Sequence, residues 1–410
     1  MYPYLNDAVL YTTSAGYRVF FARCNKEIVV TPLEEKILSL CTGVYTEKEI
    51  IQLLRKDLKC TMEKAQKVYQ DIKTKFLQEK ILRFSKTKKE YSVFRSRLDP
   101  PFETAYIALT YKGRLPGDHC NNGKNQEELY VSEWKDAIQE LVDCGCLRLF
   151  LTGGEPLLYK GVYDIIRYAR SKVLAVGIIT NGTLLDTDTI NNMVKCGVCS
   201  LHFRVEGFTA ATHDGYKDTE SFKKVITAIK TAVKTAITVK VTLLVNKNTL
   251  KRGNDFIALM KSLGVTDYDF KPVMESFKDD GVSITPDEYK IFCEGLPLLP
   301  EKNTENTHTY KMHRIDYTAC LIHPDGTVGL CPPFGTTETV IGDLITENFV
   351  EIWNSSLFKE LRDVDAFIHE TCVKCPYVAY CLGECMVKMY YMTGEITYGS
   401  WCGRSRICTF

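Results

Sequence analysis

Residues 147–156 read LRLFLTGGEP, and this segment indicates the architecture of the chain more clearly than any other. A short apolar run, typical of a buried strand, ends in two glycines, a glutamate and a proline. Four more segments pair a strand with a polar turn: TAYIALTY at 104–111, AVGIITNG at 175–182, SLHFRVEG at 200–207 and TVKVTLLVN at 238–246. Helical patterns separate these segments. The alternation predicts an α/β fold with parallel strands, as an open sheet or a barrel, and with function at the carboxyl ends of the strands.

The first 85 residues have a different pattern, with short strand-like runs from Ala8 to Val30 and three helices after them. Two helix starts have the form of a capping box, in which a hydroxyl and a carboxylate satisfy free N–H groups. The pairs are Thr31 with Glu34 and Thr46 with Glu49. A third helix is predicted from Met62 to Glu79. The charged tract at 86–103 is predicted to link this domain, residues 1–85, to the strand–helix repeat.

The composition predicts compact folding in two or three domains, because 410 residues exceed one ordinary core and 45% of them are hydrophobic. Fifty-two basic and 51 acidic residues nearly cancel, so the overall charge gives no reason to expect nucleic acid or a membrane as a partner. The sequence has no apolar stretch of about 18 residues and no secretory pattern at its N-terminus. We therefore expect a cytoplasmic protein, in which 17 cysteines favour metal ligation over structural disulfides.

The strand-end motifs resemble those of the radical SAM superfamily over residues 104 to about 275. The resemblance implies a partial (β/α)6 TIM-like barrel, assigned to residues 104–300, in which the Gly-Gly-Glu-Pro turn binds the amino group of S-adenosylmethionine (SAM). The cofactor-binding residues would be Gly153, Gly154, Glu155 and Asn181. Two glycines allow a close backbone approach, and one carboxylate complements an ammonium group. Phe222 and Asn246 also lie in segments that resemble the family, whereas Arg204-Val205-Glu206-Gly207 departs from its usual phrase.

The family holds a 4Fe-4S cluster with three cysteines spaced C-x3-C-x2-C after the first strand, and this chain departs from that motif. His119-Cys120 matches the end of the motif, but Gly113 and Gly117 stand where the other two thiolates belong. One thiolate does not hold a cubane that needs four ligands, and without the cluster SAM loses its metal anchor and its electron source. The chain is therefore predicted not to cleave SAM, either as a natural pseudoenzyme or through two Cys-to-Gly changes. A third interpretation gives His119 and Cys120 to a different metal.

A second cysteine group lies in residues 301–410. Its spacing is Cys372-x2-Cys375-x5-Cys381-x3-Cys385, followed by Cys402 and preceded by Cys320 and Cys331. Closely spaced thiolates suit iron-sulfur clusters or structural zinc. The series resembles the SPASM domain, which implies two auxiliary 4Fe-4S clusters. By that resemblance the outer cluster would be held by Cys372, Cys375, Cys381 and Cys402, and the inner cluster by Cys320, Cys331 and Cys385. The remaining inner position is either open or filled by His313, Cys293 or Cys408.

Residues 1–85 resemble the PqqD-like winged-helix domain of peptide-modifying enzymes, in which the leader of a precursor peptide adds a strand to the sheet edge. Three functions follow. The first is a non-radical protein of a ribosomal-peptide maturation system, which binds the leader and works beside an active radical SAM homologue. The second is a peptide-crosslinking radical SAM enzyme that is active in its unmodified form. The third is an iron-sulfur regulator that reads DNA, which would need a basic recognition helix, and EKEIIQLLRKDLK is mixed in charge.

Overall fold

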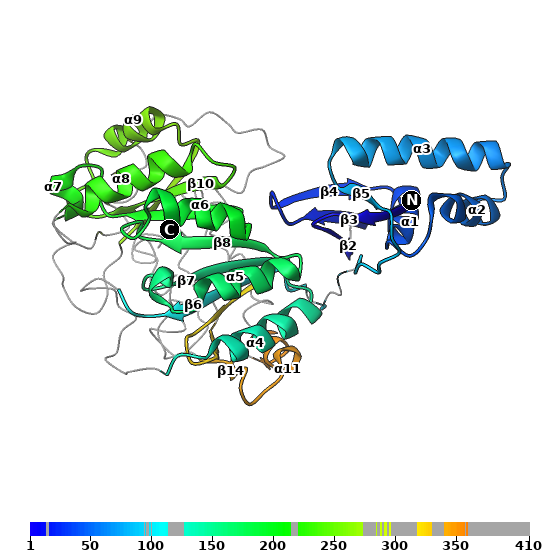
Figure 1. Cartoon of the computed structure of the whole chain (residues 1–410). Coiled ribbons are helices and arrows are strands. Elements are labelled where there is room, and N and C mark those ends of the chain that lie inside the picture. Colours follow the sequence, from blue (N-terminus) through cyan, green and yellow to red (C-terminus); the bar gives the residue numbers. More distant parts are fainter. Residues whose placement is uncertain are drawn as a thin grey trace, which may run out of the picture.

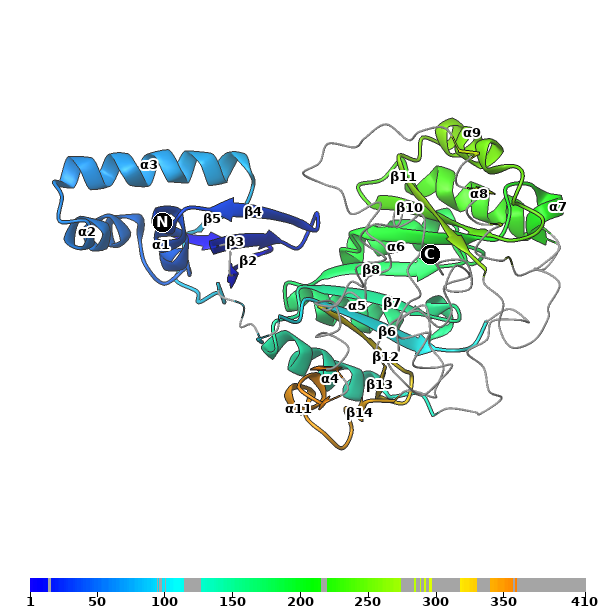
Figure 2. The same ribbon diagram turned by 180° about the vertical axis from the view of Figure 1, so that it is seen from behind.

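The computed structural model describes residues 1–13, 16–93, 95, 98–99, 101–113, 127–214, 220–273, 284, 288, 291–292, 295–296, 318–329, 340–356 and 358–359. These residues form an N-terminal domain of strands and helices and a larger sheet that helices cover on one face (Figures 1 and 2). Within the described part of the chain, no helix is long and apolar enough to cross a membrane.

The N-terminal domain contains two small antiparallel sheets. One has the order β2 (Ala8–Thr13), β3 (Gly16–Phe21) and β4 (Lys26–Val30), and the other pairs β1 (Tyr2–Leu5) with β5 (Leu82–Ser85). Three helices lie between β4 and β5: α1 (Pro32–Leu40), α2 (Glu47–Asp57) and α3 (Met62–Gln78). The three central strands and the three helices were predicted. Strands β1 and β5 were not, because each has four residues, too few to show an alternating pattern, and each finds its partner at the other end of the domain.

Both predicted capping boxes are present. The Thr31 hydroxyl accepts a hydrogen bond from the Glu34 N–H at 3.3 Å, and the Glu34 carboxylate accepts one from the Thr31 N–H at 2.8 Å. Thr46 and Glu49 make the same two bonds at 3.3 and 2.7 Å. Each box satisfies donors that a helix start leaves unpaired, a contribution of about 1 kcal/mol. Lys75 of α3 pairs with Glu34 at 2.5 Å and so fixes α3 against the start of α1.

The larger sheet has the strand order β11-β10-β9-β8-β7-β6-β12-β13-β14. Its first seven strands are parallel: β6 (Thr104–Thr110), β7 (Arg148–Gly153), β8 (Ala175–Thr180), β9 (Ser200–Val205), β10 (Thr238–Val245), β11 (Asp267–Pro272) and β12 (Ala319–Ile322). Strands β13 (Thr327–Gly329) and β14 (Gly342–Asp343) continue it antiparallel. The parallel α/β architecture confirms the prediction. Strand β11 was missed because its sequence, DYDFKP, alternates charge with aromatic residues and ends in proline.

Five helices connect the strands and cover one face of the sheet (Figure 1). They are α4 (Val131–Asp143), α5 (Val162–Ser171), α6 (Thr187–Cys196), α8 (Ser221–Ala232) and α9 (Gly253–Leu263). Two short helices are also present: α7 (Ala210–His213) follows β9, and α11 (Phe349–Trp353) follows β14. The helices bury their apolar faces, as Trp134 and Ile138 of α4 show. Because parallel strands share one direction, their carboxyl ends meet along one edge of the sheet.

The N-terminal domain contacts the opposite edge, where the strands begin. Seven buried side chains form a shared apolar cluster: Val9, Tyr11, Phe20 and Ala22 from the domain, and Leu147, Ala175 and Cys199 from the strand starts. Arg148, the first residue of β7, pairs with Glu27 of β4 and with Glu103 at 3.2 Å. A second ion pair joins Arg170 to Asp7 at 3.1 Å. Apolar and charged contacts together hold the domain at the amino ends of the strands.

Part of the predicted linker at 86–103 packs on the N-terminal domain. The Leu10 N–H donates to the Val93 carbonyl at 2.6 Å, and the Arg95 N–H donates to the Leu10 carbonyl at 2.9 Å. Tyr91 stacks on Tyr4 with ring centroids 4.2 Å apart. The outer edge of β2 is therefore occupied by the chain itself.

Candidate functional site

The turn after β7 lies against the end of β6 and requires its two glycines. The Gly154 N–H donates to the Thr110 carbonyl at 2.8 Å, and the Glu155 N–H donates to the Lys112 carbonyl at 2.9 Å. A Cβ atom at Gly153 would overlap the Thr110 carbonyl oxygen, and one at Gly154 would overlap the Lys112 carbonyl oxygen. Glycine is therefore needed at both positions for the backbones to meet.

The Glu155 carboxylate connects this turn to the end of β8. It is 1% exposed and accepts hydrogen bonds from the Thr180 hydroxyl at 2.8 Å and from the Asn181 N–H at 3.0 Å. The Leu157 N–H adds a longer bond at 3.3 Å. Burial raises the pKa of Glu155, and these hydrogen bonds offset only part of that effect. Both oxygens thus have donors within the protein, so Glu155 ties β7 to β8.

Two of the other residues predicted from the family resemblance, Asn181 and Asn246, make hydrogen bonds at the strand ends. The Asn181 amide oxygen accepts from the Thr183 N–H at 2.9 Å and shapes the turn after β8. The Asn246 amide nitrogen donates to the Glu206 carbonyl at 2.9 Å and joins the ends of β10 and β9. Phe222 lies in the first turn of α8. Asn181 and Asn246 therefore directly follow strand ends, whereas Phe222 lies in a helix.

Gly113 lies directly beneath the Gly-Gly-Glu-Pro turn, three residues after the end of β6. Its φ is +74°, a left-handed conformation that residues with a Cβ rarely adopt. A Cβ atom there would lie 2.8 Å from Leu158 Cδ1 and 3.1 Å from Glu155 Cβ. Gly113 therefore meets the turn that the family resemblance assigns to SAM, but it offers no thiolate. His119, Cys120 and Gly117 lie outside the described residues.

Two contacts at this edge were not predicted. The Tyr111 hydroxyl and His323 Nδ1 are hydrogen-bonded, and His323 is buried just after β12. Glu128 accepts from the Thr110 hydroxyl at 2.5 Å and pairs with Lys112 at 3.1 Å. The sequence carried one usable clue, since His323 directly follows a short apolar run, as the other strand-end residues do.

Cys320 is the one predicted auxiliary-cluster ligand within the described residues. It lies in β12 opposite Ala105 of β6, is fully buried and belongs to the apolar core. Burial raises the pKa of its thiol well above the ordinary value, and Cys146 nearby raises it further. The other predicted ligands, Cys331, Cys372, Cys375, Cys381, Cys385 and Cys402, lie outside the described part of the chain, as do His313, Cys293 and Cys408. Among the residues that the structure does describe, no group of three potential metal ligands gathers.

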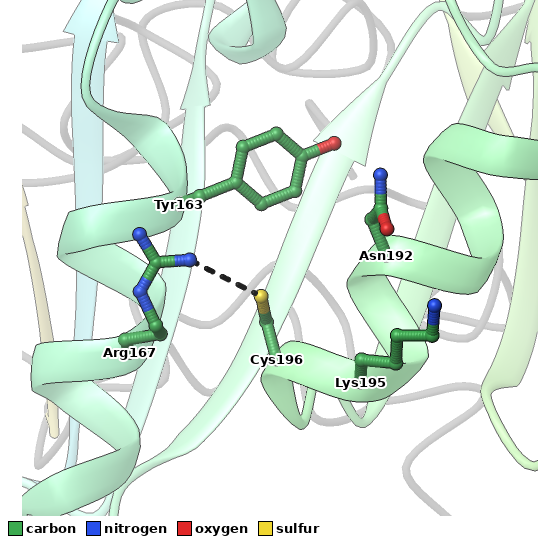
Figure 3. Close-up of a pocket in the computed structure, with 5 residues that line it drawn as sticks. All are labelled: Tyr163, Arg167, Asn192, Lys195 and Cys196. Carbon is green, nitrogen blue, oxygen red and sulfur yellow. Dashed lines mark hydrogen bonds between the residues drawn. The ribbon is translucent and has the colours of Figure 1, made fainter.

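A hollow of about 440 Å³ lies apart from the strand ends, between α5 and α6 (Figure 3). Tyr163, Arg167, Asn192, Lys195 and Cys196 line it, and Arg167 donates to the Cys196 sulfur at 3.8 Å. No strand-end residue lines this hollow, so it is separate from the candidate site.

Comparison with known families gives two matches. Residues 110–259 match the Radical SAM superfamily, and residues 314–376 match the SPASM iron-sulfur cluster-binding domain. Three similar proteins differ in their activities. The chain is 26% identical to an AdoMet-dependent heme synthase of Methanosarcina barkeri, with 68% of this chain and 89% of that protein covered. It is 23% identical to the mycofactocin maturase MftC of Mycobacterium tuberculosis, with 73% and 81% covered. It is 23% identical to the subtilosin biosynthesis protein AlbA of Bacillus subtilis, with 69% and 67% covered.

Solved structures share the fold at low sequence identity. SuiB of Streptococcus suis bound to S-adenosylmethionine superimposes with a TM-score of 0.61 at 13% identity, covering 95% of this chain and 96% of that one. The same protein bound to its precursor peptide SuiA gives 0.59 at 13% identity, with 95% and 97% covered. The enzyme anSMEcpe with bound AdoMet and Cp18Cys peptide gives 0.56 at 18% identity, with 70% and 90% covered.

Proposed function

Because residues 110–259 match the Radical SAM superfamily and residues 314–376 match the SPASM domain, we propose that the chain serves the maturation of a ribosomally made precursor peptide without cleaving SAM itself. Residues 1–85 bind the leader, residues 104–300 form the barrel, and residues 301–410 hold two auxiliary 4Fe-4S clusters. The names of two relatives support the peptide substrate, since one is a mycofactocin maturase and another takes part in subtilosin biosynthesis. An active radical SAM homologue would then supply the radical chemistry.

The proposed loss of SAM cleavage rests on the residue at position 113, which is glycine. The residue lies against Glu155 and Leu158 of the predicted SAM turn, where the family has a thiolate. Its left-handed backbone suits glycine, so the turn and the glycine fit each other without a cluster. With Gly117 as the second replacement, Cys120 is left as a single thiolate, which does not retain a 4Fe-4S cluster. The residues present therefore do not fit the SAM cluster.

The test is to incubate the reconstituted protein with SAM and dithionite under anaerobic conditions and to measure 5′-deoxyadenosine. We expect no product above a protein-free control. The variant Gly113→Cys with Gly117→Cys is the comparison, because restoring both thiolates is necessary for any such activity. Enzyme-dependent 5′-deoxyadenosine from the unmodified chain would refute the proposal.

The auxiliary clusters are tested by metal content. Two clusters give about eight iron atoms per chain, and three would give about twelve. The variants Cys320→Ser and Cys331→Ser distinguish a cysteine that holds a cluster from one that only packs in the core. Loss of about four iron atoms from both variants supports the proposed inner ligand set, whereas loss from Cys331→Ser alone makes Cys320 a core residue. Zinc in place of iron would overturn the cluster assignment.

The proposed leader site is the outer edge of β4. Among the described strands β4 pairs with β3 alone, whereas the chain itself occupies the outer edge of β2. Val29 of β4 is 62% exposed, which leaves an apolar side chain beside unpaired edge groups. An extended peptide that adds a strand there gains main-chain hydrogen bonds and an apolar contact.

Binding of the cognate precursor tests this assignment. We expect a dissociation constant of about micromolar, or about −8 kcal/mol, which deletion of residues 1–85 abolishes. Val29→Asp should weaken binding at least about tenfold, because the charge meets the apolar side of the added strand. Val194→Asp is the matched control, since Val194 is an exposed valine that lies on helix α6 and not on the N-terminal domain. Unchanged affinity after the deletion would remove leader binding from this domain.

A further inference from the structure

Besides the hollow between α5 and α6, a groove lies in the N-terminal domain, between α1 and α2. It has a volume of about 510 Å³. Its lining residues come from both helices and the turn that follows α2: Lys36, Ser39, Leu40, Leu53, Leu54, Lys56, Asp57 and Lys59. Helix α2 is at the end of the domain farthest from the barrel in both views, so the barrel leaves this groove open (Figures 1 and 2). We call it the α1–α2 groove.

The floor of the α1–α2 groove is apolar and only partly covered. Leu54 is 1% exposed and packs in the domain core, whereas Leu53 is 40% exposed. Leu40 is half-buried and packs against the same core. The exposed Leu53, beside the half-buried Leu40, offers an anchoring surface for another apolar side chain.

The rim of the groove is basic. Lys36 forms an ion pair with Asp57, the single carboxylate of the groove. Neither Lys56 nor Lys59 pairs with a carboxylate of the described residues, and both are exposed. Two ammonium groups thus face solvent on one side of an apolar floor, which complements a peptide that carries both carboxylates and apolar side chains.

The surrounding domain has the same sign of charge. Residues 1–85 contain 14 basic and 10 acidic residues, a net charge of +4, whereas residues 86–410 contain 38 and 41, a net charge of −3. The near-zero charge of the whole chain hides this separation. A positive field over the N-terminal domain attracts an acidic ligand and repels a basic one.

We propose that the α1–α2 groove binds an acidic segment of the precursor peptide that carries leucine-sized side chains. The identity of the partner rests on the proposed function, whereas the chemistry of the segment follows from the groove. The groove residues are distinct from β4, so the leader has two contacts, a strand at β4 and an acidic anchor between α1 and α2. Helices of nine and eleven residues are about 14–17 Å long, enough for four or five extended residues.

The experiment uses the full chain and a fluorescein-labelled peptide in which pairs of glutamates separate single leucines. A second peptide carries glutamine in place of glutamate. Fluorescence anisotropy at low salt should show at least tenfold tighter binding of the glutamate peptide, with affinity falling as salt rises. Lys56→Glu with Lys59→Glu should remove that preference, and Leu53→Ser should weaken both peptides.

The matched control is Lys64→Glu with Lys67→Glu, which makes the same charge change on exposed residues of α3. It should alter affinity less than twofold. If the groove variant and the unmodified chain bind the glutamate peptide equally well, the inference is overturned. Displacement of that peptide by a DNA duplex would also overturn it. Measuring affinity for the cognate precursor distinguishes the two proposals. If the groove variants leave this affinity unchanged, the acidic anchor is refuted. If Val29→Asp leaves it unchanged, the added strand at β4 is refuted.

Discussion

Comparison of two glycines with the same φ shows how closely Gly113 is packed against the predicted SAM turn. Gly113 and Gly264 both have φ of +74°, but their surroundings differ. No atom lies within 4 Å of a Cβ at Gly264, whereas a Cβ at Gly113 would lie 2.8 Å from Leu158 Cδ1. Alanine at Gly264, the residue that ends α9, therefore adds backbone strain alone, and alanine at Gly113 adds strain and an overlap.

The expected losses in the free energy of unfolding follow from backbone strain and steric overlap. A residue with a Cβ in the left-handed region costs about 1–2 kcal/mol at either position. The overlap at Gly113 adds about 1 kcal/mol, because Leu158 is 43% exposed and its far end moves at low cost. Gly113→Ala should lower the free energy of unfolding by about 2–3 kcal/mol, and Gly264→Ala by about 1–2 kcal/mol. Urea unfolding of both variants, monitored by tryptophan fluorescence, gives the difference.

Leu158→Ala in the Gly113→Ala background isolates the overlap. It should remove the excess cost at Gly113, since Leu158 supplies the nearest atom. A Gly113→Ala variant that is as stable as Gly264→Ala, or more stable than the unmodified chain, would contradict the packing described for this turn. The same two terms oppose Gly113→Cys, so restoring both thiolates carries a cost in stability besides its gain in ligands.

Three further predictions concern the links between elements. Arg148→Ala should destabilise the contact between the N-terminal domain and the barrel by about 2 kcal/mol, because Glu27 loses a charged partner, and should speed limited proteolysis between them. Burial raises the pKa of Glu27, but Arg148, Tyr11 and Arg18 together outweigh burial and lower it. The stabilisation from Glu27 is therefore complete above the unfolded pKa of about 4.5 and is lost as pH falls through the lower folded value, and Glu27→Gln should abolish this pH dependence in urea unfolding. Thr180→Val should cost about 2 kcal/mol by taking a donor from the buried Glu155 carboxylate, whereas Thr180→Ser should cost less than half of that; equal losses would show that the hydroxyl bond contributes little.

Much of the fold was readable from local patterns. The strand at 147–154 and its four counterparts were predicted because short apolar runs alternated with helical patterns, and these runs became parallel strands. Both capping boxes formed because their bonds span three residues and need no other part of the chain. Strands β1 and β5 were missed because their pairing joins the two ends of the domain.

The sequence predicted which residues lie at the candidate site but not which side chains contact one another there. The sequence placed Glu155 and Asn181 at strand ends, yet the bond from Thr180 to Glu155 requires that β7 and β8 be neighbours. The bond between Tyr111 and His323 joins positions 212 apart, and it exists because β12 pairs with β6. Such contacts follow from the order of strands in the sheet, which alternation alone does not give.

The two ends of β7 lie at two different parts of the molecule, the N-terminal domain and the candidate site. Arg148 begins the strand and contacts the N-terminal domain, while Gly153 ends it at the candidate site. Five residue steps of about 3.3 Å place these ends about 17 Å apart, so a leader held at β4 needs about five extended residues to bring its following segment to the other edge. A change at Gly113 therefore alters the candidate site at one edge, whereas the contacts of the N-terminal domain lie at the other edge. Under the proposed function, this separation lets a chain without a SAM cluster keep its leader-binding domain and still serve peptide maturation.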